Sequence, residues 1–322
     1  MNPSNEPLLD VRDLSVRYLT ARGQVRAVDK VSFNVQPGEV VGLAGESGSG
    51  KSTIAHALLR ILHPPAVITG GQALFEGRDI MAMDDPELEA FRWSKISIVF
   101  QSAMNALNPV MKIRDQITDV MLHHGVDKSE AAQRAVDLFD LVGIEPARLD
   151  AYPHQLSGGM RQRAVIAIAL ALKPPMLIMD EPTTALDVVV QKDILEQITE
   201  LRKKLGFSIL FITHDLSLLV EISTHISIMY AGDIVEKAPA RELFENPKHP
   251  YTLGLMNSFP SISGAKQKLV GIPGSPPDLV APPSGCKFHP RCAKAMPVCS
   301  QIAPVNRQLS ADHSVACHLF DK

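Results

Sequence analysis

The chain has 322 residues, a formal charge of −3 at pH 7 and a hydrophobic content of 45%. This length suits one large domain or two modest ones, and the weak negative charge without a long basic run disfavours nucleic acid as the main partner. The longest apolar run, Ala164 to Leu172, has nine residues, well short of the roughly 18 needed to cross a membrane. The first residues are acidic and lack an apolar signal-peptide core, so the cytoplasm is the expected compartment.

Residues 8–35 alternate apolar and polar side chains twice, with Gly23 in the connection. This pattern predicts an antiparallel pair of strands. Tyr18 lies near the end of the first strand, where its ring can stack on a base. The alternative is an edge-strand tyrosine with its hydroxyl in solvent.

The stretch Gly45 to Ser52, GESGSGKS, fits the phosphate-binding pattern G-x-x-x-x-G-K-[ST]. A buried strand is predicted before it at 40–44 and a helix after it at 52–62, which is the context that such a loop requires. Lys51 would reach the β- and γ-phosphates and Ser52 would bind Mg²⁺. A flexible Gly/Ser turn is the alternative interpretation.

The next segment predicts a short strand around residues 70–80 and a buried strand at 96–100, which Gln101 follows directly. From about 102 to 155 the pattern becomes helical and more polar. Asp127 and Glu130 indicate a capping box for a helix that stops at Gly143. A helical insert within an α/β domain is therefore expected.

The stretch LSGGMRQR at 156–163 precedes an alanine-rich helical run to Lys173. Adjacent glycines at a helix start present N–H groups to an anion, although such a pair is more often a simple helix start.

A strand predicted at 176–179 ends directly before Asp180 and Glu181. Ligands bind at the carboxyl ends of parallel strands, and consecutive carboxylates there suit Mg²⁺ and a polarised water. After a helix at about 188–204, a strand at 207–213 ends before His214 in the same way. A solvated acidic turn and a surface histidine are the alternatives.

The only cysteines, Cys286, Cys292, Cys299 and Cys317, fall in the last 37 residues. This tail has little periodic core, and cytoplasmic thiols stay reduced. Four thiolates can bind an iron–sulfur cluster or a structural zinc, and the spacings of five, six and seventeen residues fit neither common pattern. A metal centre is expected, free thiols remain the alternative, and His289 and His313 are possible substitute ligands.

The order of GESGSGKS, Gln101, LSGGM, MLIMDE, the ALD at 185–187, and His214 resembles the ATPase subunit of ATP-binding cassette transporters, from Leu8 to about Lys237. The tail resembles the peptide and nickel importer branch in HPYTLGLMNSFP, IPGSPPDLVAPPSGC and CKFHPRC. The resemblance implies an α/β P-loop NTPase with a mixed central sheet, an antiparallel β subdomain and a helical subdomain at about 102–160. It implies a nucleotide-binding domain at 1–237 and a cysteine-containing extension at 238–322.

The resemblance also implies roles for individual residues. Glu181 would act on the attacking water, and His214 would contact the γ-phosphate. Gln101 would sense the γ-phosphate and the transmembrane partner and, with Ser52, bind Mg²⁺. Asp180 would support Mg²⁺ and Tyr18 would stack on adenine. The phosphate-binding residues would be Gly45, Ser47, Gly48, Gly50, Lys51, Ser52 and Thr53, and those serving the ATP of a facing subunit would be Ser157, Gly158 and Gly159.

By the same resemblance the protein is an ATP-hydrolysing importer subunit at the cytoplasmic face of the membrane. Its cofactors would be ATP, Mg²⁺ and a [4Fe–4S] cluster, with Zn²⁺ as the alternative. Its partners would be a second ATPase subunit, expected to be a different chain, two permease subunits and a solute-binding protein, with no nucleic acid. A soluble ABC-type ATPase of DNA repair or translation is the main alternative, and a kinase of a small metabolite is a weaker one. The imported solute, whether peptide, nickel, opine or oligosaccharide, is not encoded in these motifs.

Overall fold

The computed structural model describes residues 6–101, 106–183, 187–258 and 271–321. The chain divides into two compact units. The first comprises residues 1–35, 40–81 and 212–322, and the second comprises residues 36–39 and 82–211.

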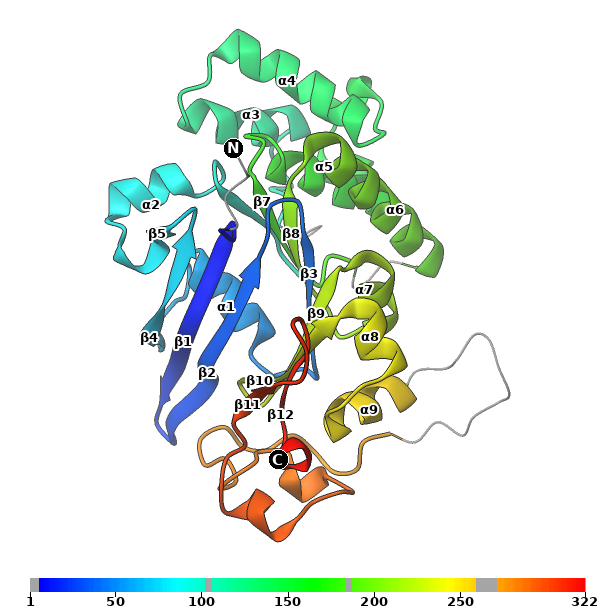
Figure 1. Cartoon of the computed structure of the whole chain (residues 1–322). Helices are drawn as coiled ribbons and strands as arrows, with labels where there is room; N and C mark the ends of the chain where they lie inside the picture. Colours follow the sequence, from blue (N-terminus) through cyan, green and yellow to red (C-terminus); the bar gives the residue numbers. More distant parts are fainter. Residues whose placement is uncertain (1–5, 102–105, 184–186, 259–270, 322) are drawn as a thin grey trace. The chain divides into compact units, whose positions relative to one another are not determined.

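The first unit contains an antiparallel sheet in the order β2-β1-β4-β5 (Figure 1). Its strands are β1 (Leu9–Thr20), β2 (Gly23–Val35), β4 (Ala66–Phe75) and β5 (Arg78–Asp79). Strands β1 and β2 pair from Leu9 opposite Val35 to Thr20 opposite Gly23, which confirms the predicted antiparallel pair. Apolar side chains of β1 and β2 alternate into the core because successive side chains of a strand point to opposite faces.

A second sheet in this unit is mixed, with the order β11-β12-β10-β9-β3. Its strands are β3 (Val40–Ala44), β9 (His225–Tyr230), β10 (Asp233–Pro239), β11 (Asn306–Gln308) and β12 (Ser314–Ala316). Strand β3 is parallel to β9, and β10 is antiparallel to β9. All of β3 is buried, as expected for a parallel strand covered on both faces. The helices of this unit are α1 (Lys51–Leu58), α7 (Leu216–Ile222), α8 (Ala240–Glu245) and α9 (Pro250–Asn257).

The C-terminal part of the chain joins this mixed sheet. Strand β12 pairs with β10, and β11 pairs with β12. Short 3₁₀ helices carry much of the remaining extension: η5 (His289–Arg291), η6 (Pro297–Ser300) and η7 (His318–Phe320). The extension is therefore held to the unit by backbone hydrogen bonds as well as by side chains.

The second unit contains the parallel pair β6 (Ile96–Val99) and β7 (Met176–Asp180), with β8 (Ser208–Ile212) next to β7. Its α-helices are α2 (Asp85–Phe91), α3 (Ile113–His123), α4 (Lys128–Leu141), α5 (Gly158–Ala169) and α6 (Val188–Leu205). Its 3₁₀ turns are η3 (Pro146–Asp150) and η4 (Pro153–Gln155). The 3₁₀ turn η1 (Ile80–Ala82) covers the point in the sequence where the chain passes from the first unit to the second. The predicted helical insert is confirmed where the structure describes it, and residues 102–105 lie outside the described residues.

Two predicted helices are shorter than expected. Helix α1 stops at Leu58 rather than Leu62, and Arg60 beyond it has a left-handed φ of 50°. Helix α5 stops at Ala169 rather than Lys173, which has a φ of 52°. Left-handed backbone cannot continue a right-handed helix, so apolar spacing alone overestimated both lengths.

Candidate functional site

The loop between β3 and α1 depends on glycine. Gly45, Gly48 and Gly50 have φ values of 151°, 78° and 106°, which L side chains rarely adopt. A Cβ on Gly45 would lie 2.2 Å from the Met229 carbonyl oxygen, and one on Gly50 would lie 2.1 Å from that of Ala27. The loop therefore keeps its backbone close to two neighbouring segments, as a phosphate cradle requires.

Lys51 is the first residue of α1 and is 4% exposed. Its Nζ donates to the carbonyl oxygens of Gly45 at 2.8 Å and Glu46 at 3.0 Å, and lies 3.4 Å from Ser49 Oγ. The ammonium group therefore lies within the turn of the loop, which we call the phosphate loop (residues 45–52).

Tyr18 and His214 both lie in the first unit. The Tyr18 hydroxyl lies 3.3 Å from Thr53 Oγ1 in the first turn of α1. His214 is exposed and follows β8, and the N–H of Thr213 beside it donates to the Leu43 carbonyl in β3 at 3.3 Å. Both residues thus belong to the unit that carries the phosphate loop.

In the second unit, a set of residues that we call the carboxylate edge (Gln101, Asp180 and Glu181) lies beyond β6 and β7. Asp180 ends β7 and is 2% exposed. Glu181 follows with a φ of 45°, and Gln101 Nε2 donates to Glu181 Oε2 at 3.0 Å. The structure brings together two residues that are 80 positions apart in the sequence.

Ser157 caps α5, with its Oγ accepting the Met160 N–H at 3.3 Å. Ser157 is exposed, and Gly158 and Gly159 are half-buried at the helix start. The start of α5 is therefore partly accessible to solvent. Asp187 caps α6, whereas the preceding Ala185 and Leu186 lie outside the described residues.

Sequence reasoning missed three residues at the phosphate loop: Glu46, Tyr251 and Arg291. Arg291 donates to both carboxylate oxygens of Glu46, at 2.7 and 2.9 Å, and the Glu46 N–H donates to the Tyr251 hydroxyl at 2.9 Å. Tyr251 lies in HPYTLGLM and Arg291 in CKFHPRC, two stretches that carry the family resemblance of the tail. No local sequence pattern connects either residue to Glu46.

The expected metal centre is not supported by the structure. Among the described residues, no group of three or more His, Cys, Asp or Glu side chains could hold a metal ion. Burial raises the pKa of the Cys286 thiol to about 11, and the other three cysteines contribute to this rise. The Cys286 N–H donates to the Cys299 carbonyl at 2.8 Å.

The suggested substitute ligands have other contacts. His313 lies between two carboxylates, with its ring nitrogens 2.9 Å from Glu236 Oε1 and 2.8 Å from Glu242 Oε1. His289 Nδ1 lies 2.9 Å from the Cys286 carbonyl oxygen. Because both nitrogens of His313 already have carboxylate partners, the suggestion that it replaces a cysteine ligand is wrong.

The helices of the described part of the chain include none that is both long and apolar enough to span a membrane.

Two family models match the chain. The model described as "ABC transporter" matches residues 28–184, and the model described as "Oligopeptide/dipeptide transporter, C-terminal region" matches residues 235–299. The chain is 41% identical over 318 residues to the dipeptide transport ATP-binding protein DppD of Caldanaerobacter subterraneus, with 98% of each chain covered. It is 44% identical to the oligopeptide transport ATP-binding protein OppD of Bacillus subtilis, with 97% of this chain and 89% of that one covered.

Solved structures agree with the predicted fold. The dimeric bacterial ABC transporter cassette MJ0796 is similar with a TM-score of 0.64 and 27% identity, over 72% of this chain and 99% of that chain. The protein cbiO1 of Clostridium perfringens, described as part of an ABC transporter complex, gives a TM-score of 0.66 and 28% identity, over 75% and 92% of the two chains. The expected α/β fold of the P-loop ABC type is confirmed.

Proposed function

This chain belongs to the ABC transporter family, and from that membership we propose that it drives uptake of peptides or similar small solutes through separate transmembrane subunits. It is the ATP-hydrolysing subunit of an ABC importer of the dipeptide and oligopeptide type. The observation that carries this conclusion is the likeness to peptide-transport ATP-binding proteins over nearly the whole chain. A DNA-repair or translation ATPase is not favoured, because the match includes the transporter-specific C-terminal region.

We assign ATP phosphate binding to the phosphate loop and Thr53, with the roles of Gly45, Ser47, Gly48, Gly50, Lys51 and Ser52 as the resemblance implies. The left-handed glycines and the inward-facing Lys51 support this assignment. Tyr18 would stack on adenine, and His214 would contact the γ-phosphate. The Tyr18 hydroxyl beside Thr53 places the ring close to the start of α1, which is compatible with that role.

We assign hydrolysis to the carboxylate edge. Glu181 would orient and polarise the attacking water, and Gln101 would hold its carboxylate through the 3.0 Å hydrogen bond while sensing the γ-phosphate. Ser52 in the first unit, and Gln101 and Asp180 in the second, each carry a side-chain oxygen of the kind that Mg²⁺ prefers. A Mg²⁺ ion held by such donors would supply positive charge next to the phosphates.

We further propose that two cassettes act head to tail. Ser157, Gly158 and Gly159 would then serve the ATP held by the facing subunit. The exposed Ser157 and the half-buried glycines at the start of α5 support this arrangement. The remaining partners would be a second ATPase subunit of different sequence, two permease subunits and a solute-binding protein. This assembly would hold the chain at the cytoplasmic face of the membrane.

The division into a nucleotide-binding domain at 1–237 and an extension at 238–322 is also a proposal. Its boundary falls within β10, whose Glu236 and Lys237 pair with Val315 and Ser314 of the extension. The two parts would therefore share a sheet rather than a linker.

A narrower proposal is that Cys286, Cys292, Cys299 and Cys317 hold a [4Fe–4S] cluster. The described side chains contain no group that could hold a metal ion, so either metal centre would require the four sulfurs to move together. A zinc ion at about 2.3 Å from four thiolates would require the closest grouping, whereas a cluster separates its ligands because each cysteine binds a different iron. Anaerobically purified protein should then absorb broadly near ~400 nm and contain about four irons per chain. Colourless protein that binds one zinc, or no metal, would refute the cluster.

The transport function is tested by reconstituting the chain with its permease partners in lipid vesicles. ATP hydrolysis should rise several-fold when the binding protein is loaded with a dipeptide or oligopeptide, and labelled peptide should accumulate inside. Stimulation by nickel or an oligosaccharide but not by peptide would correct the cargo, and ATP hydrolysis without any transport would contradict the importer assignment.

A further inference from the structure

Glu46, in the phosphate loop, is held from several directions. Its N–H donates to the Tyr251 hydroxyl at 2.9 Å, and its carboxylate receives two N–H groups of Arg291 at 2.7 and 2.9 Å. Its carbonyl oxygen accepts from Lys51 Nζ at 3.0 Å. The same residue thus connects Tyr251 and Arg291 with the lysine that is assigned to the phosphates.

The two side chains that reach Glu46 are buried. Tyr251 is 0% exposed, and the Arg291 side chain is 6% exposed. Arg291 Nε also donates to the Pro273 carbonyl at 2.8 Å, and its guanidinium carbon lies 5.7 Å from the Tyr230 ring centre. The hydrogen bonds to Glu46 raise the pKa of Arg291. A two-pronged charged contact in such a site is strong and fixes both partners in one geometry.

Tyr251 is supported by packing. Its ring lies 4.6 Å from that of Tyr230 and 5.3 Å from that of Phe288, centre to centre. Such aromatic pairs are stabilising beyond the area that they bury. His249 caps α9 by accepting the Tyr251 N–H at 3.0 Å. The hydroxyl of Tyr251 is therefore presented to the loop by a rigid support.

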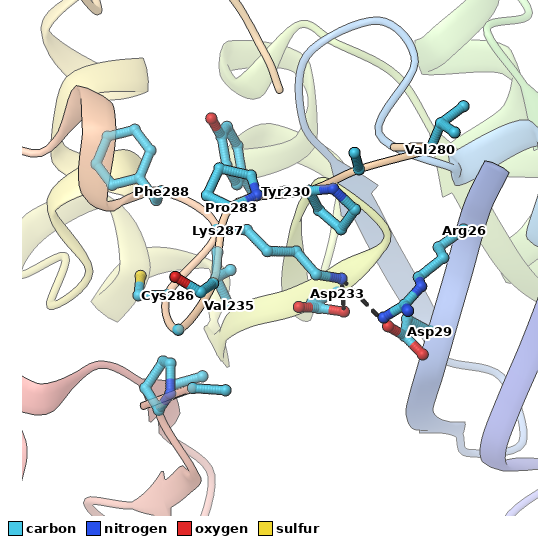
Figure 2. A pocket seen from close by; sticks show the side chains of 17 residues that line it. Arg26, Asp29, Tyr230, Asp233, Val235, Val280, Pro283, Cys286, Lys287 and Phe288 are labelled. Carbon is cyan, nitrogen blue, oxygen red and sulfur yellow. Dashed lines mark hydrogen bonds and ion pairs between the residues drawn. The ribbon is translucent and has the colours of Figure 1, made fainter. Parts of the chain in front are cut away.

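A second contact anchors the same segment of the extension. Lys287 Nζ lies 2.8 Å from Asp233 Oδ1 and 3.3 Å from Asp29 Oδ2, and it donates to the Ala231 carbonyl at 3.1 Å. Figure 2 shows Lys287 reaching toward Asp233 and Asp29. All three side chains line a cavity of about 510 Å³. Lys287 and Arg291 are the first and last residues between Cys286 and Cys292. This short segment is therefore attached at each end to the rest of the first unit.

We propose that Arg291 and Tyr251 are positioning residues for ATP binding, through which the C-terminal extension sets the nucleotide affinity of the phosphate loop. They act through Glu46, whose carbonyl helps to place Lys51. A loop held in its binding geometry loses less conformational entropy when the ligand arrives. The inference rests on the proposed ATPase function and adds a determinant of affinity outside the ATP motifs.

The test is a double-mutant cycle on the full-length chain. Binding of MgATP is measured by titration with a fluorescent ATP analogue in the wild type, Arg291→Ala, Glu46→Ala and the double variant. Each single variant should bind about five- to tenfold more weakly, and the double variant should bind no more weakly than either single one, because coupled residues are not additive. In the assembled transporter the change should appear in KM for ATP, with kcat reduced less than twofold.

Arg22→Ala is the matched control. Arg22 also pairs with a carboxylate, Asp278 Oδ2 at 2.6 Å, but the two side chains are 77% and 49% exposed. Exposed pairs contribute little, so ATP affinity should stay within twofold of the wild type. Tyr251→Phe keeps the ring packing and removes only the hydroxyl, so it tests the same idea even if Arg291→Ala unfolds the extension. It should weaken ATP binding about threefold, in the range of a lost hydrogen bond.

Unchanged ATP affinity in folded Arg291→Ala and Tyr251→Phe would overturn the inference, as would independent, multiplying effects in the double variant. These results leave the proposed function intact as long as the wild type binds and hydrolyses ATP. Failure of the wild type to bind ATP would instead contradict the proposed function itself.

Discussion

The phosphate loop and the carboxylate edge differ in how their functional groups are supported. In the loop, Glu46 contacts the fully buried Tyr251 and the nearly buried Arg291. At the edge, Asp180 is buried at the end of β7, and the half-buried Glu181 beyond it accepts a hydrogen bond from the exposed Gln101.

This difference matches the tasks assigned to the two regions. A group that binds ground-state phosphates gains from being fixed before the ligand arrives. A group that acts on water must be within hydrogen-bond reach of that water in the assembled site, and its geometry often tightens only there. We therefore expect changes in the loop to alter binding and changes at the edge to alter turnover.

The largest expected effect is at the carboxylate edge. Glu181→Gln removes the carboxylate that polarises water, so turnover should fall by about 10²- to 10⁴-fold while ATP affinity stays near the wild-type value. ATP hydrolysis by the assembled transporter and nucleotide binding are measured side by side.

Glu200→Gln serves as the control, because Glu200 is an exposed carboxylate on α6 of the same unit, and it should hydrolyse ATP normally. Wild-type hydrolysis by Glu181→Gln would show that the role assigned to Glu181 is wrong. Lys51→Ala should give the opposite result, with ATP binding itself weakened.

The next effect concerns the contribution of a facing cassette to each ATP site. If each site needs Ser157 to Gly159 of a facing cassette, the isolated chain should be a poor ATPase. Its rate per subunit should rise roughly tenfold with protein concentration or on addition of the permease partners, since bringing groups together lowers the barrier. High turnover that is independent of concentration in a verified monomer would contradict the head-to-tail proposal.

A smaller effect is expected from the backbone of the phosphate loop. Gly50→Ala places a Cβ 2.1 Å from the Ala27 carbonyl oxygen at a φ of 106°, so it should destabilise the fold by about 2–3 kcal/mol and weaken ATP binding. Gly48→Ala, with a φ of 78° and no heavy atom within 4 Å, should cost only about 1 kcal/mol. Gly70→Ala, with open space and no left-handed φ, is the neutral control, and equal melting temperatures for all three would refute the close-approach argument.

The sequence predicted the parts of the site that lie next to each other along the chain. The phosphate loop lies between its strand and helix, and Asp180 lies at the end of β7, because these positions follow from local patterns of burial and turn residues. Helix ends were predicted less well, since the turns after Leu58 and Ala169 are set by local backbone geometry that apolar spacing does not report.

The contact of Glu46 with Arg291 was not predictable, because it joins residues 245 positions apart. The phosphate-binding pattern does not specify the residue at position 46, and a single arginine between a proline and a cysteine carries no periodic signal. The same holds for His313, which the fold places between Glu236 and Glu242.

The smallest expected effect is a pH dependence of the free energy of unfolding, which arises from the buried His249. Burial lowers the pKa of His249 from 6.5 to about 3, because the buried ring is disfavoured in its charged form. The unfolded chain therefore binds a proton below pH 6.5 that the folded chain does not bind. The free energy of unfolding should fall as the pH drops below about 6.5, by about 2 kcal/mol between pH 7.5 and pH 5.

His249→Asn isolates this contribution. Asparagine can accept the N–H bond that caps α9, but it does not titrate, so its unfolding free energy should lose about 2 kcal/mol less than that of the wild type over the same interval. Chemical denaturation at pH 7.5 and pH 5 measures the difference. The hydrogen bond to Asp321 raises the pKa of His318 despite burial, so His318 changes stability with pH in the opposite direction. Both proteins contain His318, so its contribution cancels when they are compared. If the unfolding free energies of the two proteins change equally between pH 7.5 and pH 5, burial of His249 does not make the fold acid-sensitive.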